Sequence, residues 1–281
     1  MFKKISPLFT LLSVACFFNL STAWAVEYQS PRTLALGGAG RGGPLLNDSI
    51  YLNPSYASFT PTYSLTGGYL WFNQGRNYNF SVEDSRTELF QAGLGYTKRE
   101  QNSTINLGAS KTLMSHWGVG LGAKYIIDND SGKKTSNFSL STSYIAAPWA
   151  YVSLIADNLI SSRDSTSRNL NRTFYAGIKV LPMERVSVFA DPLYSPEYKA
   201  GAKAGFALGT EITVMSDFLL RLGRFQQGEI SHLNTRGCGS GIGLGYLGPK
   251  IRFDYAFTRI SSTDAGYGAS TSNSIETTIF F

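Results

Sequence analysis

Ser274-Ile-Glu-Thr-Thr-Ile-Phe-Phe281 ends the chain with alternating apolar and polar side chains, and Ile275, Thr277, Ile279 and Phe281 share one face. Successive side chains of a β-strand point to opposite faces, so this pattern predicts a strand with an apolar stripe on one face. The last residues of a soluble domain usually fray. A complete strand at the carboxyl terminus therefore sets this chain apart from most soluble domains.

The same alternation recurs along most of the chain. Residues 117–128 place Trp117, Leu121 and Tyr125 on one face and three glycines with Lys124 on the other. Most of the predicted strands have about the 9–11 residues that cross a bilayer at a tilt, whereas soluble strands average about 5–6. Fourteen strands are predicted, at residues 62–72, 77–84, 88–98, 103–113, 117–128, 134–144, 149–158, 172–181, 186–193, 202–214, 218–226, 239–246, 250–260 and 274–281.

The predicted connections sort by length. Every long one is odd-numbered from the N-terminus. The odd-numbered connections are predicted at residues 73–76, 99–102, 129–133, 159–171, 191–201, 227–238 and 261–273. The even-numbered connections are predicted tight turns, at residues 85–87, 114–116, 145–148, 182–185, 215–217 and 247–249. A soluble β-sandwich has no reason to sort its loops by end, whereas outer-membrane barrels combine short periplasmic turns with longer outer loops. Residues 62–281 are therefore predicted to form an all-β, fourteen-stranded antiparallel transmembrane barrel.

Residues 1–25 predict a cleaved export signal. Lys3 and Lys4 precede a mostly apolar stretch at residues 8–20, and Ala23-Trp-Ala25 supplies a cleavage pattern of small residues. An uncleaved anchor is one alternative, although the apolar stretch is shorter than the ~20 residues that a spanning helix needs. Lipid attachment at Cys16 is another. The predicted location is the outer membrane of a Gram-negative bacterium.

A final strand ending in phenylalanine resembles the C-terminal signal that the outer-membrane assembly machinery recognises on bacterial barrels. The resemblance makes Phe281 the expected assembly signal. The expected partners are that machinery, outer-membrane lipid and lipopolysaccharide, and small hydrophobic molecules.

Composition agrees with a closed β-structure. Phe and Tyr number 18 and 16, Gly numbers 29, and only 16% of residues are charged. The 25 basic residues lose Lys3 and Lys4 with the signal, which leaves 23 against 19 acidic residues, or +4. This modest surplus, without a basic cluster, predicts no nucleic-acid partner. Cys238 is the only cysteine after residue 25, so no intramolecular disulfide is expected.

The segment before the first strand, residues 26–61, contains Ser30-Pro-Arg-Thr-Leu-Ala-Leu-Gly-Gly-Ala-Gly40 and Asn47-Asp-Ser-Ile-Tyr-Leu-Asn-Pro-Ser-Tyr-Ala57. It resembles the N-terminal motif of the FadL superfamily, a glycine-rich stretch followed by an Asp-containing segment and an Asn-Pro-Ala signature. The resemblance implies a hatch folded inside the barrel. The matching positions are Gly37, Gly38, Gly40, Asp48, Tyr51, Asn53 and Pro54.

Two functions follow from the resemblance and stay open. FadL-type barrels transport hydrophobic compounds across the outer membrane, whereas the shorter PorV-like branch consists of non-enzymatic accessories of protein secretion. The alternative for the segment itself is a disordered periplasmic tail. Its six leucines and isoleucines between Leu34 and Leu52 make it too apolar for that. In the hatch, Pro54 fixes its own φ and restricts Asn53 to extended conformations.

An enzyme is not expected. Some outer-membrane barrels are lipid hydrolases with a Ser/His pair, but His116 falls in a predicted periplasmic turn and His232 in an outer loop. A general base must reach its nucleophile within hydrogen-bond distance, and the ~30 Å hydrocarbon core separates the two ends. One cysteine and two histidines suit no metal cluster. The glycine run at residues 239–245 lies in a predicted strand and is expected to leave room for the hatch, so no cofactor is predicted.

Charged residues on the predicted inner face are the remaining candidate site. They are expected to pair with one another and with Asp48 of the hatch, or to form a polar lining that passes a small solute. The lumen-lining candidates are Lys124, Lys179, Lys203, Glu211, Arg221, Arg252 and Asp254.

Overall fold

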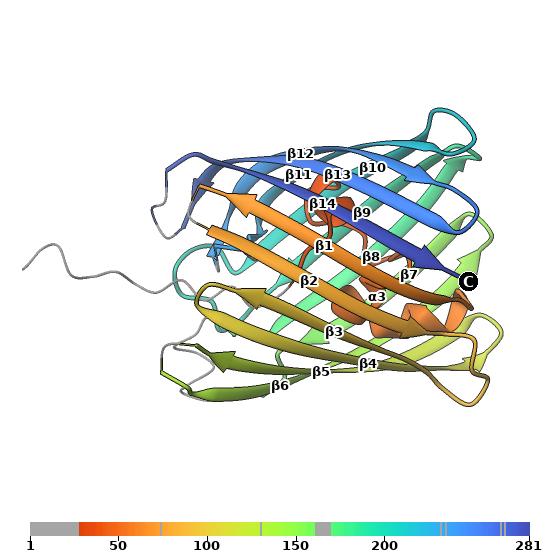
Figure 1. The fold of residues 1–281 in the computed structure, drawn as a ribbon, viewed down its shortest axis with the longest axis horizontal. Coiled ribbons are helices and arrows are strands. Elements are labelled where there is room, and N and C mark those ends of the chain that lie inside the picture. Colours follow the sequence, from red (N-terminus) through yellow and green to blue (C-terminus); the bar gives the residue numbers. More distant parts are fainter. Residues whose placement is uncertain are drawn as a thin grey trace, which may run out of the picture.

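The fold is a closed antiparallel barrel of fourteen strands (Figure 1). The computed structural model describes residues 28–281 except 74, 130, 161–169, 231, 234, 265 and 267, so the predicted signal lies outside the described residues. Each strand pairs with its neighbours in sequence, and β1 closes the ring with β14. The strands are β1 (Tyr63–Phe72), β2 (Gly75–Asp84), β3 (Gln91–Arg99), β4 (Asn102–Met114), β5 (Trp117–Asp128), β6 (Lys134–Ala147), β7 (Ala150–Asp157), β8 (Thr173–Met183), β9 (Val186–Tyr194), β10 (Ala204–Thr213), β11 (Phe218–Ile230), β12 (Thr235–Leu247), β13 (Ile251–Thr263) and β14 (Ser270–Phe280).

All fourteen predicted strands are present, and the predicted bounds of β5 match those observed. Several strands are longer than predicted at one end of the barrel. The predicted loops at residues 227–238 and 261–273 are largely the extended ends of β11 to β14, and the predicted loop at 191–201 begins only after Tyr194. These ends continue because ladder hydrogen bonds hold polar strand residues as well as apolar ones.

The two ends of the barrel differ as predicted in where the longest connections lie, but the connections predicted at 73–76 and 99–102 span only residues 73–74 and 100–101. The two longest connections lie at one end, here called the loop end: residues 158–172, of which 161–169 are not described, and residues 195–203. The other end, here called the turn end, carries the C-terminus (Figure 1). Its β2–β3 connection spans residues 85–90 rather than a tight turn at 85–87, because β3 begins only at Gln91.

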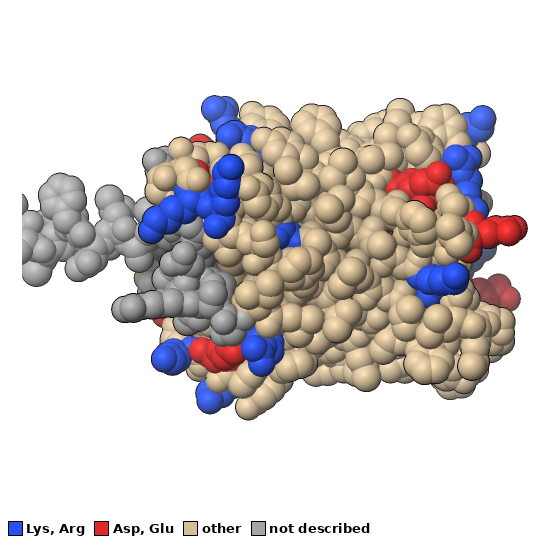
Figure 2. All heavy atoms as spheres, turned by 90° about the horizontal axis from the view of Figure 1, so that it is seen from below, with Lys and Arg blue, Asp and Glu red and all other residues tan. Residues whose placement is uncertain are grey.

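Side chains alternate between a buried inner face and an exposed, apolar outer face. In β5, Trp117 and Leu121 are exposed whereas Lys124 is buried, which confirms the predicted register. Figure 2 shows charged side chains gathered at the two ends, with a surface nearly free of charge between them. An apolar band of this kind is the face that a barrel presents to lipid. Among the described residues, no helix is long and apolar enough to cross a membrane.

The carboxyl terminus completes the ring. Phe281 donates its backbone N–H to the carbonyl of Tyr63 at 2.8 Å, and the two aromatic rings lie 6.1 Å apart. The last strand thus carries its alternation to the end of the chain, with Ile275 and Ile279 outward and Glu276 buried.

The segment before β1 lies within the ring of strands (Figure 1) and is here called the inner segment, residues 28–62. It forms two short helices, α2 (Pro31–Ala35) and α3 (Asp48–Leu52), and a 3-10 helix, η2 (Pro54–Phe59). Ser30 caps α2 by accepting a hydrogen bond from the backbone N–H of Thr33 at 3.2 Å, and Pro31 starts the helix.

Glycines on the inner wall make room for this segment. A Cβ on Gly241 of β12 would lie 2.0 Å from the carbonyl oxygen of Leu34, and one on Gly223 of β11 would lie 2.0 Å from the carbonyl carbon of Leu36. On the opposite wall, a Cβ on Gly120 of β5 would lie 2.2 Å from the backbone nitrogen of Ser55. Within the glycine run at residues 239–245, Gly241 and Gly243 lie against the inner segment, whereas Gly239 and Gly245 lie against residues of the wall.

Candidate functional site

The turn after α2 carries the three glycines of the hatch motif, and each has a positive φ that favours glycine: +67° at Gly37, +86° at Gly38 and +133° at Gly40. A Cβ on Gly37 would also lie 2.6 Å from the backbone nitrogen of Arg224 in β11. The turn therefore requires glycine both for its conformation and for its contact with the wall.

Asp191 of β9 holds the loop that follows. Its Oδ2 accepts hydrogen bonds from the backbone N–H groups of Gly40 and Arg41, both at 2.9 Å. The Arg41 guanidinium lies 3.7 Å from the same carboxylate and 3.7 Å from the centre of the Tyr175 ring. Asp191 is fully buried. A buried charge needs such partners, so this carboxylate fixes the loop at residues 40–43 against the wall.

The ladder between β8 and β9 weakens where that loop presses on it. It pairs Tyr175 with Leu193 and continues in the same register with Ile178 and Ala190, but the two residues between them on each strand form no ladder pair. Pro192 lies in this gap and has no N–H to donate. From the lumen, Gly42 packs so closely on β8 that an added Cβ would lie 2.5 Å from the carbonyl carbon of Ile178.

Asn53 joins two parts of the inner segment to the wall. Its side-chain amide donates to the carbonyl of Arg41 at 2.8 Å and to the hydroxyl of Ser143 in β6 at 2.9 Å. Its side-chain oxygen accepts from the hydroxyl of Ser55 at 2.6 Å. Asn53 is extended, with φ −165°, as the following Pro54 predicts. The sequence motif therefore coincides with the point at which three polar groups meet.

Replacing Asn53 with alanine should loosen the inner segment and leave the barrel assembled. The substitution removes three hydrogen bonds and leaves buried groups unpaired, at about 1–3 kcal/mol for each unpaired group, whereas the strand ladders stay intact. Uptake of a hydrophobic dye should rise while the folded protein keeps its heat-modifiable migration on a gel.

The matched control is Asn73→Ala, because Asn73 is exposed and lies outside the lumen. Loss of barrel assembly in Asn53→Ala would contradict the prediction and make Asn53 a folding determinant. Unchanged uptake would show that this contact does not hold the segment.

Asp48 and Tyr51, the other hatch positions, are buried on α3. A carboxylate oxygen of Asp48 lies 3.8 Å from the guanidinium of Arg32. The hydroxyl of Tyr51 accepts from the side-chain amide of Asn79 in β2 at 2.8 Å. Nearby, Tyr28 donates to Glu276 of β14 at 2.7 Å, although 248 residues separate the two in sequence.

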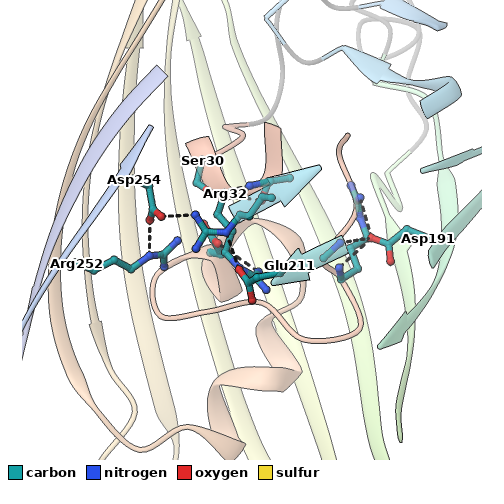
Figure 3. Close-up of polar contacts among 11 residues, drawn as sticks. Ser30, Arg32, Asp191, Glu211, Arg252 and Asp254 are labelled. Carbon is teal, nitrogen blue, oxygen red and sulfur yellow. Dashed lines mark hydrogen bonds and ion pairs between the residues drawn. The ribbon is translucent and has the colours of Figure 1, made fainter. Parts of the chain in front are cut away.

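A chain of buried charges links the inner segment to the wall (Figure 3). Arg32 of α2 and Arg221 of β11 both donate to Glu211 of β10, at 3.1 and 2.6 Å. Arg221 also pairs with Asp254 of β13, which in turn pairs with Arg252. Four of the predicted lumen residues are therefore brought together, and a residue of the inner segment lies among them.

The other three predicted lumen residues lie apart from this chain. Lys124 is buried and bonded to Asp157 of β7 at 2.6 Å. Lys179 is half-buried, with its amine 5.2 Å from the centre of the Tyr151 ring. Lys203 is exposed in the connection before β10. The predicted strand began at residue 202, but β10 begins at Ala204, so the extrapolated alternation does not apply to Lys203.

Sequence reasoning did not single out Arg32, Asp157, Asp191 or Glu276. The pair Asp191-Pro192 predicts the start of a loop, whereas Asp191 lies within β9. The alternation did contain a signal for two of them. Asp157 and Glu276 occupy inner-face positions on strands whose outward residues are mostly apolar.

An apolar cluster closes the loop end above these charges. Leu36 and Ala39 of the inner segment pack with Phe225, Ile230 and Leu233 in one buried cluster. Beside it, the ring of His232, in the connection between β11 and β12, lies 4.8 Å from the ring of Phe72 in β1. Burial, together with the positive charge of Arg99, lowers the pKa of His232 to about 4.

These features do not assemble a catalytic site in the described part of the chain. His116 is exposed at the turn end with Ser115 at 2.8 Å, and His232 is buried at the loop end. Neither ring nitrogen of His232 has a hydrogen-bond partner among the described residues. No group of three or more His, Cys, Asp or Glu side chains there could hold a metal ion.

Comparisons with known proteins identify the fold. No family model and no curated protein matches the chain. The toluene transporter TbuX of Ralstonia pickettii matches with a TM-score of 0.62 at 11% identity, over 91% of this chain and 98% of its own. The toluene transporter TodX of Pseudomonas putida gives 0.61 at 11% identity, over 92% and 98%. A FadL homologue of Pseudomonas aeruginosa gives 0.57 at 10% identity, over 92% and 99%. This chain therefore has the fold of the FadL-type outer-membrane barrels.

Proposed function

We propose that this chain is an outer-membrane channel for small hydrophobic compounds, in which the inner segment closes the lumen and has to move for passage. The fold supports the proposal, because the structures that share it include two toluene transporters. The apolar outer face supports an outer-membrane location. The sorting of long connections to one end supports the orientation, with the loop end outside the cell.

The observation that carries the proposal is the interrupted β8–β9 ladder beneath the loop at residues 40–43. A hydrophobic compound gains nothing from a charged lumen, so a passage through the wall into lipid suits it better than one along the barrel axis. The interruption is a stretch of the wall in which two residues on each strand form no ladder pair, and Pro192 has no N–H with which to form one. Gly40 and Arg41, bound to Asp191, cover it from inside.

The apolar cluster at the loop end is the proposed entrance. Leu36 and Ala39 belong both to this cluster and to the turn that leads to the loop at residues 40–43. A compound that displaces Leu36 from Phe225 and Leu233 would therefore pull on the loop that covers the wall interruption. The exchange of one apolar contact for another costs little free energy, which suits passive passage.

A reversible tether tests whether the inner segment must move. The hydroxyl oxygens of Ser55 and Ser143 lie 2.7 Å apart, so cysteines at both positions suit a disulfide between the segment and β6. In a Cys238→Ser background, the oxidised double cysteine variant should lose toluene uptake in proteoliposomes, and reductant should restore it. The single variant Ser143→Cys is the control. Uptake that is equal with and without the tether would reject the proposed movement.

A second candidate function has one observation in its favour. In the described residues, buried ion pairs join the inner segment to the wall and two wall strands to each other, as expected of a sealed scaffold rather than a channel. A PorV-like accessory of protein secretion would need no passage. A deletion strain separates the two candidates: loss of growth on aromatics or long-chain fatty acids supports the channel, and a changed profile of secreted proteins with normal growth supports the accessory.

A further inference from the structure

The outward-facing charges on the strands at the loop end are basic. They stand where the apolar band gives way to polar residues, and all are exposed: Arg76, Lys98, Lys134, Arg224 and Arg259. Among the described strand residues, no Asp or Glu takes an outward position at this end. The turn end differs, since Arg86 there pairs with Asp84. The outward charges on the strands of the loop end are therefore not balanced by acidic residues on the same strands.

Two of these arginines stand on one row of the sheet. The register pairs Arg224 of β11 with Ser240 of β12, and Ser240 with Arg259 of β13. Neighbouring strands lie about 4.8 Å apart, so the two arginine Cα atoms are separated by roughly 10 Å with a serine between them. Both side chains are long enough to reach one anionic group above Ser240.

The row marks the edge of the apolar band. On the side toward the membrane centre, the next outward residues are Leu222, Ile242 and Phe257. On the other side, Gln226 and Ser261 follow. Arginines at this height have an apolar surface below them and polar headgroups beside them. That is the level at which a lipid carries its phosphates.

Neither arginine has a partner within the described part of the chain. No side-chain hydrogen bond or ion pair joins the guanidinium of Arg224 or Arg259 to another described residue, whereas the buried arginines Arg32, Arg221 and Arg252 are all paired. Two unpaired like charges on one row repel each other at a membrane surface, where water screens them incompletely. A multivalent anion between them removes that cost, and guanidinium groups bind phosphate in a bidentate manner.

We propose that Arg224, Ser240 and Arg259 form a binding site for the phosphorylated glucosamine headgroup of lipopolysaccharide. The two guanidinium groups bind phosphate oxygens, the serine hydroxyl donates between them, and the acyl chains lie along Leu222, Ile242 and Phe257. The inference rests on the outer-membrane location and on the orientation with the loop end outside. It does not depend on whether the barrel passes hydrophobic compounds.

Binding of lipid A to the purified, delipidated barrel tests the site. Native mass spectrometry in detergent should detect bisphosphorylated lipid A on the wild-type protein. Arg224→Gln and Arg259→Gln should each weaken binding by about tenfold or more, because each removes a hydrogen-bonded charge pair. The double substitution Arg76→Gln/Lys98→Gln removes two outward charges from β2 and β3 and should leave this binding within about twofold.

All four side chains are exposed, so heat-modifiable migration should be unchanged and confirm the fold of every variant. Dephosphorylated lipid A should bind at least tenfold more weakly than the bisphosphorylated form, by the same reasoning about charge pairs. Equal binding by the wild type and by Arg224→Gln/Arg259→Gln would overturn the proposal. So would equal binding of phosphatidylglycerol and bisphosphorylated lipid A, since the site would then have no preference for the outer-leaflet lipid.

Discussion

Valine at Gly241 and Gly223 should displace the inner segment from a barrel that still assembles. The Cβ of each added side chain would lie 2.0 Å from the nearest backbone atom of residues 34–37. A flexible side chain could change rotamer to relieve such a clash, but backbone atoms cannot. Overpacking costs about 1–3 kcal/mol at each site. Two sites should therefore shift the docking of the segment by roughly 30-fold or more. Cells that carry the double variant should become sensitive to large antibiotics that the wild-type barrel excludes.

The control substitution is Gly67→Val. Gly67 of β1 faces outward, and its nearest neighbour for an added Cβ is a side-chain atom of Phe80 at 3.7 Å, an ordinary contact. Valine is also more favourable than glycine in a β-strand, so all variants should keep heat-modifiable migration. If the double variant folds and excludes antibiotics as the wild type does, the inner segment is not what closes the lumen.

Arg221→Met should cause the largest loss of stability among single substitutions in the lumen. The guanidinium is fully buried and neutralises both Glu211 and Asp254. After its removal, only Arg32 and Arg252 remain for the three carboxylates of Asp48, Glu211 and Asp254, so one negative charge is left unbalanced. Breaking a buried pair costs about 3–5 kcal/mol. The midpoint of urea unfolding in lipid vesicles should fall accordingly.

Two comparisons make this result specific. Arg86→Met removes an arginine from an exposed pair with Asp84 and should cost less than about 1 kcal/mol. Arg221→Met combined with Glu211→Gln removes one of the three carboxylates and should recover part of the loss. An equal loss in Arg221→Met and Arg86→Met would show that the buried charges contribute little to the free energy of unfolding.

The wall was predictable because its physics is local. Apolar and polar side chains must alternate along a strand that separates lipid from a filled lumen. The inner or outer position of Trp117, Leu121 and Lys124 can therefore be predicted without knowing which strands lie beside them. The ends of strands were less predictable, since polar residues such as those of β14 at Ser270 also enter ladders. Lys203 shows the same limit, because alternation stops where the strand stops.

The contacts inside the lumen were not predictable from periodicity. The motif resemblance located Gly37, Gly40 and Asn53, since each has a conformational requirement that the sequence carries. The wall residues that bind them have no special conformational requirement that the sequence would reveal. Asp191 binds Gly40 across 151 positions, and Arg32 binds Glu211 across 179. Only closure of the ring brings these pairs together. Because the partners are so far apart in sequence, no periodic pattern of residues predicts their contact.

The hydrogen bond from Tyr28 to Glu276 has a consequence for the order of events in assembly. The chain is synthesised from its N-terminus, so Tyr28 emerges first and its partner on β14 emerges almost last. Hairpins between neighbouring strands form sooner than contacts of high sequence separation, because the entropy of loop closure grows with chain length. The inner segment therefore reaches its final contacts after the last strand has joined β1. The inner segment is synthesised first but reaches its final contacts last, so its burial indicates that the barrel has closed.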